Sequence, residues 1–168
     1  MSKKIITFIF FLFITFSVQA NTKIAFVDID FLFENSKVGL SIKKKLENID
    51  LKNSKILKNK EKKIIDEENE IKKLQNIISK EEFDKKIGQF RINLNNYNKE
   101  KKIILNQFKN TQNSELKFFF KKINPFLLSY MSENSIDLLI EKKNIFIGKS
   151  NIDITKDILK IIDEEINK

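Results

Sequence analysis

The stretch that decides the fold is IISKEEFDKK, residues 77–86, because it separates two long amphipathic segments. Ser79 followed by Glu82 fits a capping box. In that motif the serine hydroxyl accepts a hydrogen bond from the amide three residues later, and the glutamate carboxylate accepts one from the serine amide. The pattern predicts that a new helix begins at Ser79 and that the tip of a helical hairpin lies just before it.

An apolar stripe with helical spacing lies on each side of this tip, and charged residues occupy the remaining faces. Asn53, Lys60 and Lys101 interrupt the stripes. Two antiparallel helices with such stripes can zip into a coiled-coil arm, and about 40 residues at 1.5 Å each give it a length of roughly 60 Å. Its polar flanks fit either a flexible arm or a rigid spacer. The stripe residues are Ile42, Leu46, Ile49, Leu57, Ile64, Ile71, Leu74 and Ile78, then Phe83, Ile87, Phe90, Leu94, Tyr97, Ile104 and Phe108.

The segment before the arm has a different pattern. Residues 23–27, KIAFV, are typical of a strand, and Asp28 and Asp30 after them are candidate helix N-caps. The first long helix is expected to begin near Ser36.

The segment after the arm is rich in aromatic residues and contains the only proline. We predict that Asn124 caps a restarted helix whose first residue is Pro125, because proline disrupts a helix interior. Asn134 or Ser135 would close that helix. Residues 136–148 predict two short strands around a turn at 142–144, and Thr155 predicts the cap of a last helix.

Because the hairpin returns the chain to its origin, the first and last strands can join in one small sheet. Three strands make a poor core with exposed edges, so we expect subunits to associate through this body. The predicted fold is α+β and mostly α: a body of residues 21–36 and 118–168 carries an arm of residues 37–117, with its tip near 79. The residues expected to build the body and its subunit interface are Ile24, Phe26, Val27, Leu138, Leu139 and Ile140.

The first 20 residues predict export. Lys3 and Lys4 precede an apolar run that is short for a membrane span, and Val18 and Ala20 are the small residues expected before a signal-peptidase cut. We interpret residues 1–20 as a signal peptide cleaved near Ala20, and the alternative is an uncleaved N-terminal anchor. An exported chain meets neither chromosomal DNA nor cytosolic ATP, so no nucleic-acid partner is expected.

Composition narrows the function classes further. The chain has no Cys and no His, which removes the usual nucleophile–base pairs and the commonest transition-metal ligand. Asp28 and Asp30 could hold a metal, but helix capping explains them more simply, so no enzyme, metal or cofactor is predicted. The net charge of +9 falls to +7 without residues 1–20, which hold Lys3 and Lys4 and no acid. This surplus either attracts anionic partners or reflects an AT-rich genome.

The order of these elements resembles the OmpH/Skp family of periplasmic chaperones over essentially the whole mature chain. The resemblance rests on KIAFVDIDFLFENSKVG, on the hairpin with a serine-capped tip, on INPFLLSYMSENSIDLLIEKKNIFIG and on DITKDILKIID. The sequence departs from the family in having Asn134 and Ser135 where a glycine is common before the second strand, and in its single arginine, Arg91.

The resemblance implies a periplasmic homotrimer whose three arms enclose a cavity. Such a protein holds unfolded outer-membrane β-barrel proteins without ATP and prevents their aggregation. Phe90 and Lys101 are candidate client-binding residues, and an anionic membrane surface or lipopolysaccharide is a further candidate partner. The alternative is a structural or adaptor protein of the cell envelope whose coiled-coil arms bridge one folded partner.

Overall fold

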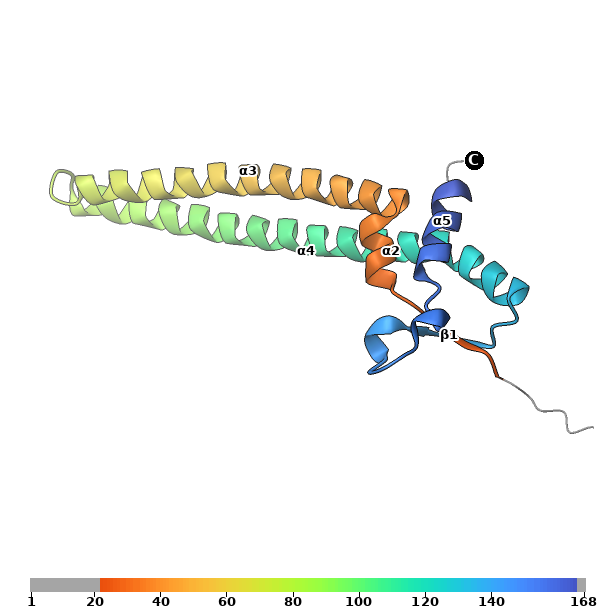
Figure 1. Ribbon diagram of the computed structural model, residues 1–168. Helices are drawn as coiled ribbons and strands as arrows, with labels where there is room; N and C mark the ends of the chain where they lie inside the picture. The colour runs from red at the N-terminus through yellow and green to blue at the C-terminus, as the bar shows by residue number, and fades with distance from the viewer. Residues whose placement is uncertain (1–21, 166–168) are drawn as a thin grey trace, which may run out of the picture.

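The protein is a long helical hairpin attached to a small α+β body (Figure 1). The computed structural model describes residues 22–165, and the expected signal peptide lies outside them. In chain order the elements are β1 (Ile24–Val27), α2 (Ile29–Asn35), α3 (Lys37–Leu74), α4 (Lys80–Glu133), β2 (Leu138–Glu141), the 3-10 turns η1 (Lys142–Asn144) and η2 (Ser150–Ile152), and α5 (Thr155–Glu165).

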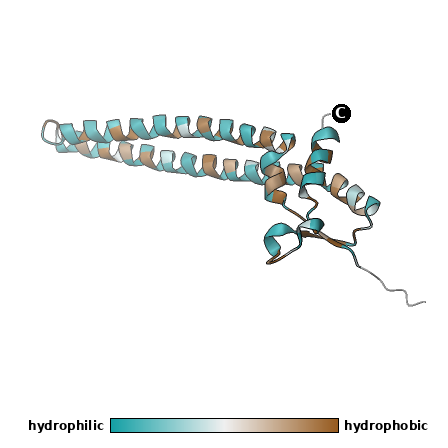
Figure 2. Ribbon diagram, viewed as in Figure 1, coloured by the Kyte–Doolittle hydropathy of each residue, from teal (hydrophilic) through white to brown (hydrophobic). Residues whose placement is uncertain are grey.

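Helices α3 and α4 run antiparallel and form the arm (Figure 1). The hydroxyl of Ser79 accepts a hydrogen bond from the Glu82 amide at 3.3 Å and caps α4. Helix α3 begins next to Ser36, as the sequence predicts, and the Ser36 hydroxyl caps it by accepting from the Gly39 amide at 3.2 Å. Figure 2 shows hydrophobic segments spaced along both arm helices between hydrophilic ones, as a narrow apolar seam requires.

Helix α4 does not restart at Pro125, so that prediction is wrong. The helix continues from the tip through Pro125 to Glu133 and connects the arm to the body without a break. An interior proline costs about 3 kcal/mol. Phe119, Ile123 and Leu127 lie on the buried face of the helix around it, and each such burial stabilises by about 1.5–3 kcal/mol. Tertiary packing therefore outweighs the local defect.

The sheet has two strands, and they are parallel. Ile24 pairs with Leu138 and Val27 with Glu141, so the entire arm forms the crossover connection between the strands. The predicted strand after residues 142–144 is absent from the described residues. The chain instead makes turn η1, loops over Phe26 and returns, and the amide of Ile154 donates to the Phe26 carbonyl at 3.0 Å. The free edge of β1 is thus taken by residues 153–154.

The core lies between one face of this sheet, the body end of α4, and helices α2 and α5. Thr155 does not cap α5, contrary to the prediction. Its hydroxyl accepts from the Asp28 amide at 2.9 Å, and the carboxylate of Asp153 accepts from the Thr155 amide at 3.0 Å. At the end of α4, Ser135 rather than Asn134 takes the left-handed conformation, with φ of 53°. The fully buried apolar side chains are Leu32, Phe119, Ile123, Ile158 and Ile162.

Candidate functional site

The body contains the residues that the sequence assigns to a subunit interface, and the structure separates them into two groups. Val27 is 2% exposed and lies in the hydrophobic core of the chain, with Leu139 packed against that core. Ile24 and Leu138 are paired across the sheet and are both exposed. Only the exposed group is free to contact another molecule without unfolding this one.

Phe26 faces away from the main core because adjacent strand residues point to opposite sides of a sheet. It is nevertheless buried, under the loop of residues 145–148. Gly148 approaches it so closely that a Cβ there would lie 3.1 Å from Phe26 Cε1. Ile140, the register partner of Phe26, is half-buried. The chain's own loop therefore covers this face of the sheet at Phe26 and leaves Ile24 and Leu138, on the same face, exposed.

The same loop carries the most exposed apolar side chains of the body. Phe146 is 99% exposed and Ile147 is 83% exposed. Sequence reasoning placed this segment in a strand and missed its position as an apolar loop tip. The sequence signal for an apolar loop tip was the pair of adjacent large hydrophobic residues in a region predicted to associate. Exposed apolar patches commonly mark interaction surfaces.

An ion pair joins turn η1, which precedes this loop, to the N-cap of α2. The Asp28 carboxylate accepts from the Phe31 amide at 2.9 Å, as predicted for an N-cap, and lies 3.0 Å from the Lys142 ammonium. The hydrogen bond from the Phe31 amide, with Lys142 beside it, lowers the pKa of Asp28 although burial opposes the shift. Asp28 in turn raises the pKa of Lys142. In residues 22–165 no three His, Cys, Asp or Glu side chains gather as a metal site would need.

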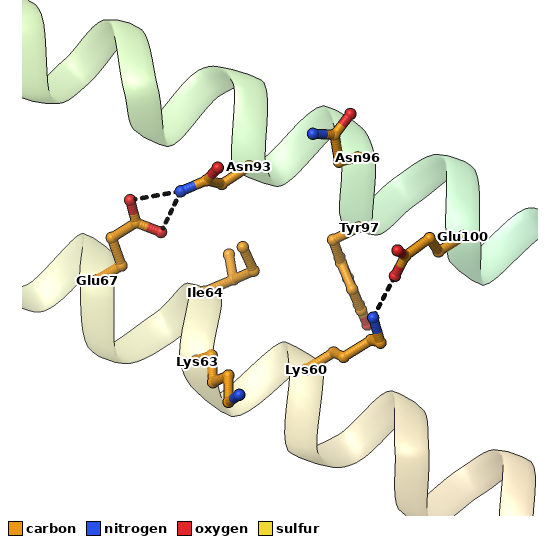
Figure 3. A pocket seen from close by; sticks show the side chains of 8 residues that line it. All are labelled: Lys60, Lys63, Ile64, Glu67, Asn93, Asn96, Tyr97 and Glu100. Carbon is orange, nitrogen blue, oxygen red and sulfur yellow. Dashed lines mark hydrogen bonds and ion pairs between the residues drawn. The ribbon is translucent and has the colours of Figure 1, made fainter.

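The middle of the arm has a polar seam, and Figure 3 shows it at close range. Here Ile64 of α3 and the buried Tyr97 of α4 lie between two polar pairs, in a groove of about 300 Å³. Lys60 forms an ion pair with Glu100. The amide nitrogen of Asn93 donates to both carboxylate oxygens of Glu67, at 2.9 and 3.1 Å. Of the three positions that the sequence marks as interruptions, Lys60 is thus paired with a polar group of the facing helix.

The two candidate client-binding residues lie at separate points on α4. The Lys101 ammonium stands 5.8 Å from the ring centre of Tyr97, at the edge of the polar seam. Phe90 is half-buried and lines a groove of about 210 Å³ toward the tip, together with Ile71 and Phe83. They could contact one client only if that client extends along the arm.

The capping residues at the tip are flanked by cations. Lys85 and Lys86 line an open groove with Glu82 and Ile78, and Ile77 is 74% exposed beside it. In the described part of the chain no helix is both long and apolar enough to cross a bilayer. At the tip, Lys85, Lys86 and the side chain of Ile77 are exposed to solvent.

Comparison with known proteins agrees with this architecture. The crystal structure of a candidate outer membrane chaperone (OmpH-like) from Caulobacter crescentus CB15 superposes with a TM-score of 0.76 at 13% sequence identity, over 89% of this chain and 88% of that one. At this identity the similarity shows the fold. No curated protein matches the chain. The sequence model of the family described as outer membrane protein (OmpH-like) matches residues 23–162, nearly all of the described structure, and the chain therefore belongs to the OmpH-like family.

Proposed function

We propose that the protein is a periplasmic holdase chaperone that binds unfolded outer-membrane β-barrel proteins and prevents their aggregation. The observation that carries this proposal is the arm, an α3–α4 hairpin with shallow open grooves and exposed apolar side chains between charges. Leu51, Ile65, Ile92 and Ile103 are each at least half exposed along it. Many weak contacts of this kind can hold an unfolded chain through avidity while each one breaks easily.

Three arms around one cavity would multiply these contacts, so the proposal includes a homotrimer assembled through the body. The exposed apolar groups that support it are Ile24, Leu138, Phe146 and Ile147, which a lone subunit leaves in water. The sheet and the loop that carry this surface would be held in place by the packing of Phe26, Val27, Leu139 and Ile140.

Within the arm we assign client contact to Phe90 and Lys101, on opposite sides of the polar seam. Phe90 offers half-buried aromatic surface and Lys101 an exposed cation. The excess of lysine along the arm would attract acidic client segments, and salt would weaken that attraction. The lysines near the tip could bind an anionic membrane surface or lipopolysaccharide by the same attraction.

The test is native mass spectrometry of residues 21–168, alone and after dilution of a urea-unfolded outer-membrane barrel protein into it at low salt. We expect a trimer that takes up one unfolded chain and keeps it soluble. The folded barrel protein in detergent is the matched control and should not bind. A monomer or dimer that ignores the unfolded chain but captures one folded envelope protein would instead establish an adaptor.

A further inference from the structure

Where α2, α3 and α4 meet at the base of the arm, an open groove of about 490 Å³ has an apolar floor and an acidic rim. We call it the basal groove. Phe33, Leu46 and Phe108 form its floor, one from each helix. Glu34, Glu47 and Asp50 form its rim, with Lys43 as the one cation among the lining residues.

The floor of the basal groove is held in place by the core. The ring of Phe33 packs edge-on against that of Phe119, with ring centres 5.0 Å apart, and Phe119 is fully buried. Leu46 also packs against the core. The floor side chains remain half-buried, so part of their apolar surface faces the groove. Such a preformed apolar surface binds a ligand without first having to be ordered.

The three rim carboxylates differ from the paired acids of the arm. Within residues 22–165, none of Glu34, Glu47 and Asp50 makes a side-chain hydrogen bond or ion pair, whereas Glu115 and Glu100 pair with lysines of the facing helix. Three acids against Lys43 give this groove a negative excess, although the chain as a whole carries +9. The polar seam differs, because its two lysines are balanced by two glutamates.

We propose that the basal groove binds a short client segment in which an apolar side chain stands next to a lysine or arginine. This inference rests on the proposed holdase function and names a substrate class for one of its sites. The apolar side chain would lie on Phe33, Leu46 and Phe108, and the neighbouring cation would reach Glu47 and Asp50. The arm would then hold basic segments here and acidic segments along its lysines.

A segment of unfolded client suits the groove better than a second copy of this chain. A stable interface between folded proteins buries roughly 800 Å² on each partner, whereas this groove has room for only a few side chains. An extended peptide can fill it with one or two residues and continue along the arm.

The test measures fluorescence anisotropy of two short peptides that share leucines and a neutral dye, one with lysines and the other with glutamates at the remaining positions. We expect the wild-type protein to bind the lysine peptide more tightly. Glu47→Gln/Asp50→Asn should weaken that binding about tenfold, because each exposed ion pair contributes only modestly, and about 0.5 M salt should weaken it similarly.

The matched control is Glu61→Gln/Asp66→Asn, which removes the same charge from exposed positions of α3 outside the groove. It should leave the preference intact. Equal binding of both peptides by the wild type would overturn the inference. So would an equal loss in the two variants, or a change in oligomeric mass for Glu47→Gln/Asp50→Asn, which would make the groove an interface between copies.

A separate readout distinguishes this inference from the proposed function. Circular dichroism should show that the Glu47→Gln/Asp50→Asn variant is folded, and aggregation of an unfolded barrel protein is followed with the wild type. If the wild type suppresses aggregation but shows no preference for the lysine peptide, the inference fails and the holdase stands. If it binds the lysine peptide at the groove but suppresses no aggregation, the holdase fails and the groove's ligand class stands.

Discussion

Gly39 determines how closely α2 and α3 approach each other. A Cβ added there would lie 1.8 Å from the carbonyl oxygen of Phe33, which is backbone and cannot move aside. Gly39→Ala should therefore lower the free energy of unfolding by about 1–3 kcal/mol through overpacking, despite the better helix propensity of alanine. Urea denaturation followed by circular dichroism measures the change.

Gly88 provides the control for this substitution. It lies in α4, and a Cβ there would meet nothing within 4 Å. Gly88→Ala should raise the free energy of unfolding by about 0.5–1 kcal/mol, because only helix propensity changes. Equal effects at the two positions would contradict the close contact between α2 and α3.

Asp28 makes stability depend on pH. The Phe31 amide and Lys142 hold the pKa of Asp28 below its ordinary value of 3.8 in the folded state. The pKa of Asp28 is lower in the folded than in the unfolded protein, so its charged carboxylate increases the free energy of unfolding at pH values above the unfolded pKa. This stabilisation is lost as pH falls through the folded pKa.

We therefore expect Asp28→Asn, which keeps a capping oxygen but loses the charge, to be less stable than wild type at pH 7. The difference should shrink as pH falls through the folded pKa of Asp28. Asp28→Ala should cost about 1 kcal/mol more than Asp28→Asn at pH 7, because it also removes the cap. Urea titrations at several pH values measure both differences. If the difference in the free energy of unfolding between wild type and Asp28→Asn does not change with pH, the titration of Asp28 is not linked to stability.

Between elements, the polar seam holds α3 and α4 in one register. Both polar groups of the Asn93 side chain are hydrogen-bonded there. Its amide nitrogen donates to the Glu67 carboxylate, and its side-chain oxygen accepts from the Gln89 side-chain amide at 3.1 Å. Pairs of this kind add little to stability compared with apolar contacts, but they disfavour other alignments. A few polar groups thus set the register of α3 and α4, and a narrow apolar stripe packs the two helices together.

Glu67→Ala should lower the stability of the arm by about 1 kcal/mol, because it leaves the half-buried amide of Asn93 without its partner. Amide hydrogen exchange of residues 60–100 measures this, since we expect local opening of the arm to need less free energy than unfolding of the body. Glu68→Ala is the control: it removes an exposed pair with Lys72 and should change exchange little. Faster exchange only in the body would contradict a local role for Glu67.

At the scale of the whole molecule, the apolar side chains of Phe146 and Ile147 in the body loop are exposed to solvent. If this loop lies in the trimer interface, Phe146→Ser/Ile147→Ser should reduce the oligomer to lower mass while circular dichroism stays unchanged. Leu51→Ser, at a 62% exposed position on the arm, is the matched control and should keep the wild-type mass. Native mass spectrometry distinguishes these outcomes, and an unchanged mass of the double variant would place the interface elsewhere.

Val27 is unsuitable for that experiment. Its side chain is 2% exposed in the subunit's own core, so Val27→Asp would bury a charge and unfold the body before it affected assembly. A lower mass for that variant would report on folding rather than on contact between subunits.

The sequence by itself determined the hairpin, its tip at Ser79, the cap Asp28, the start of the first long helix near Ser36, and the return of the chain to its first strand. These features depend on helical spacing and on hydrogen bonds between residues close in sequence. Only the tertiary structure decided the continuous helix through Pro125, the loop over Phe26, the contact of Thr155 with Asp28 and the floor of the basal groove. In each of these, contacts with residues distant in sequence outweigh a local preference, because burial of side chains such as Phe119 stabilises more than one proline or one cap costs.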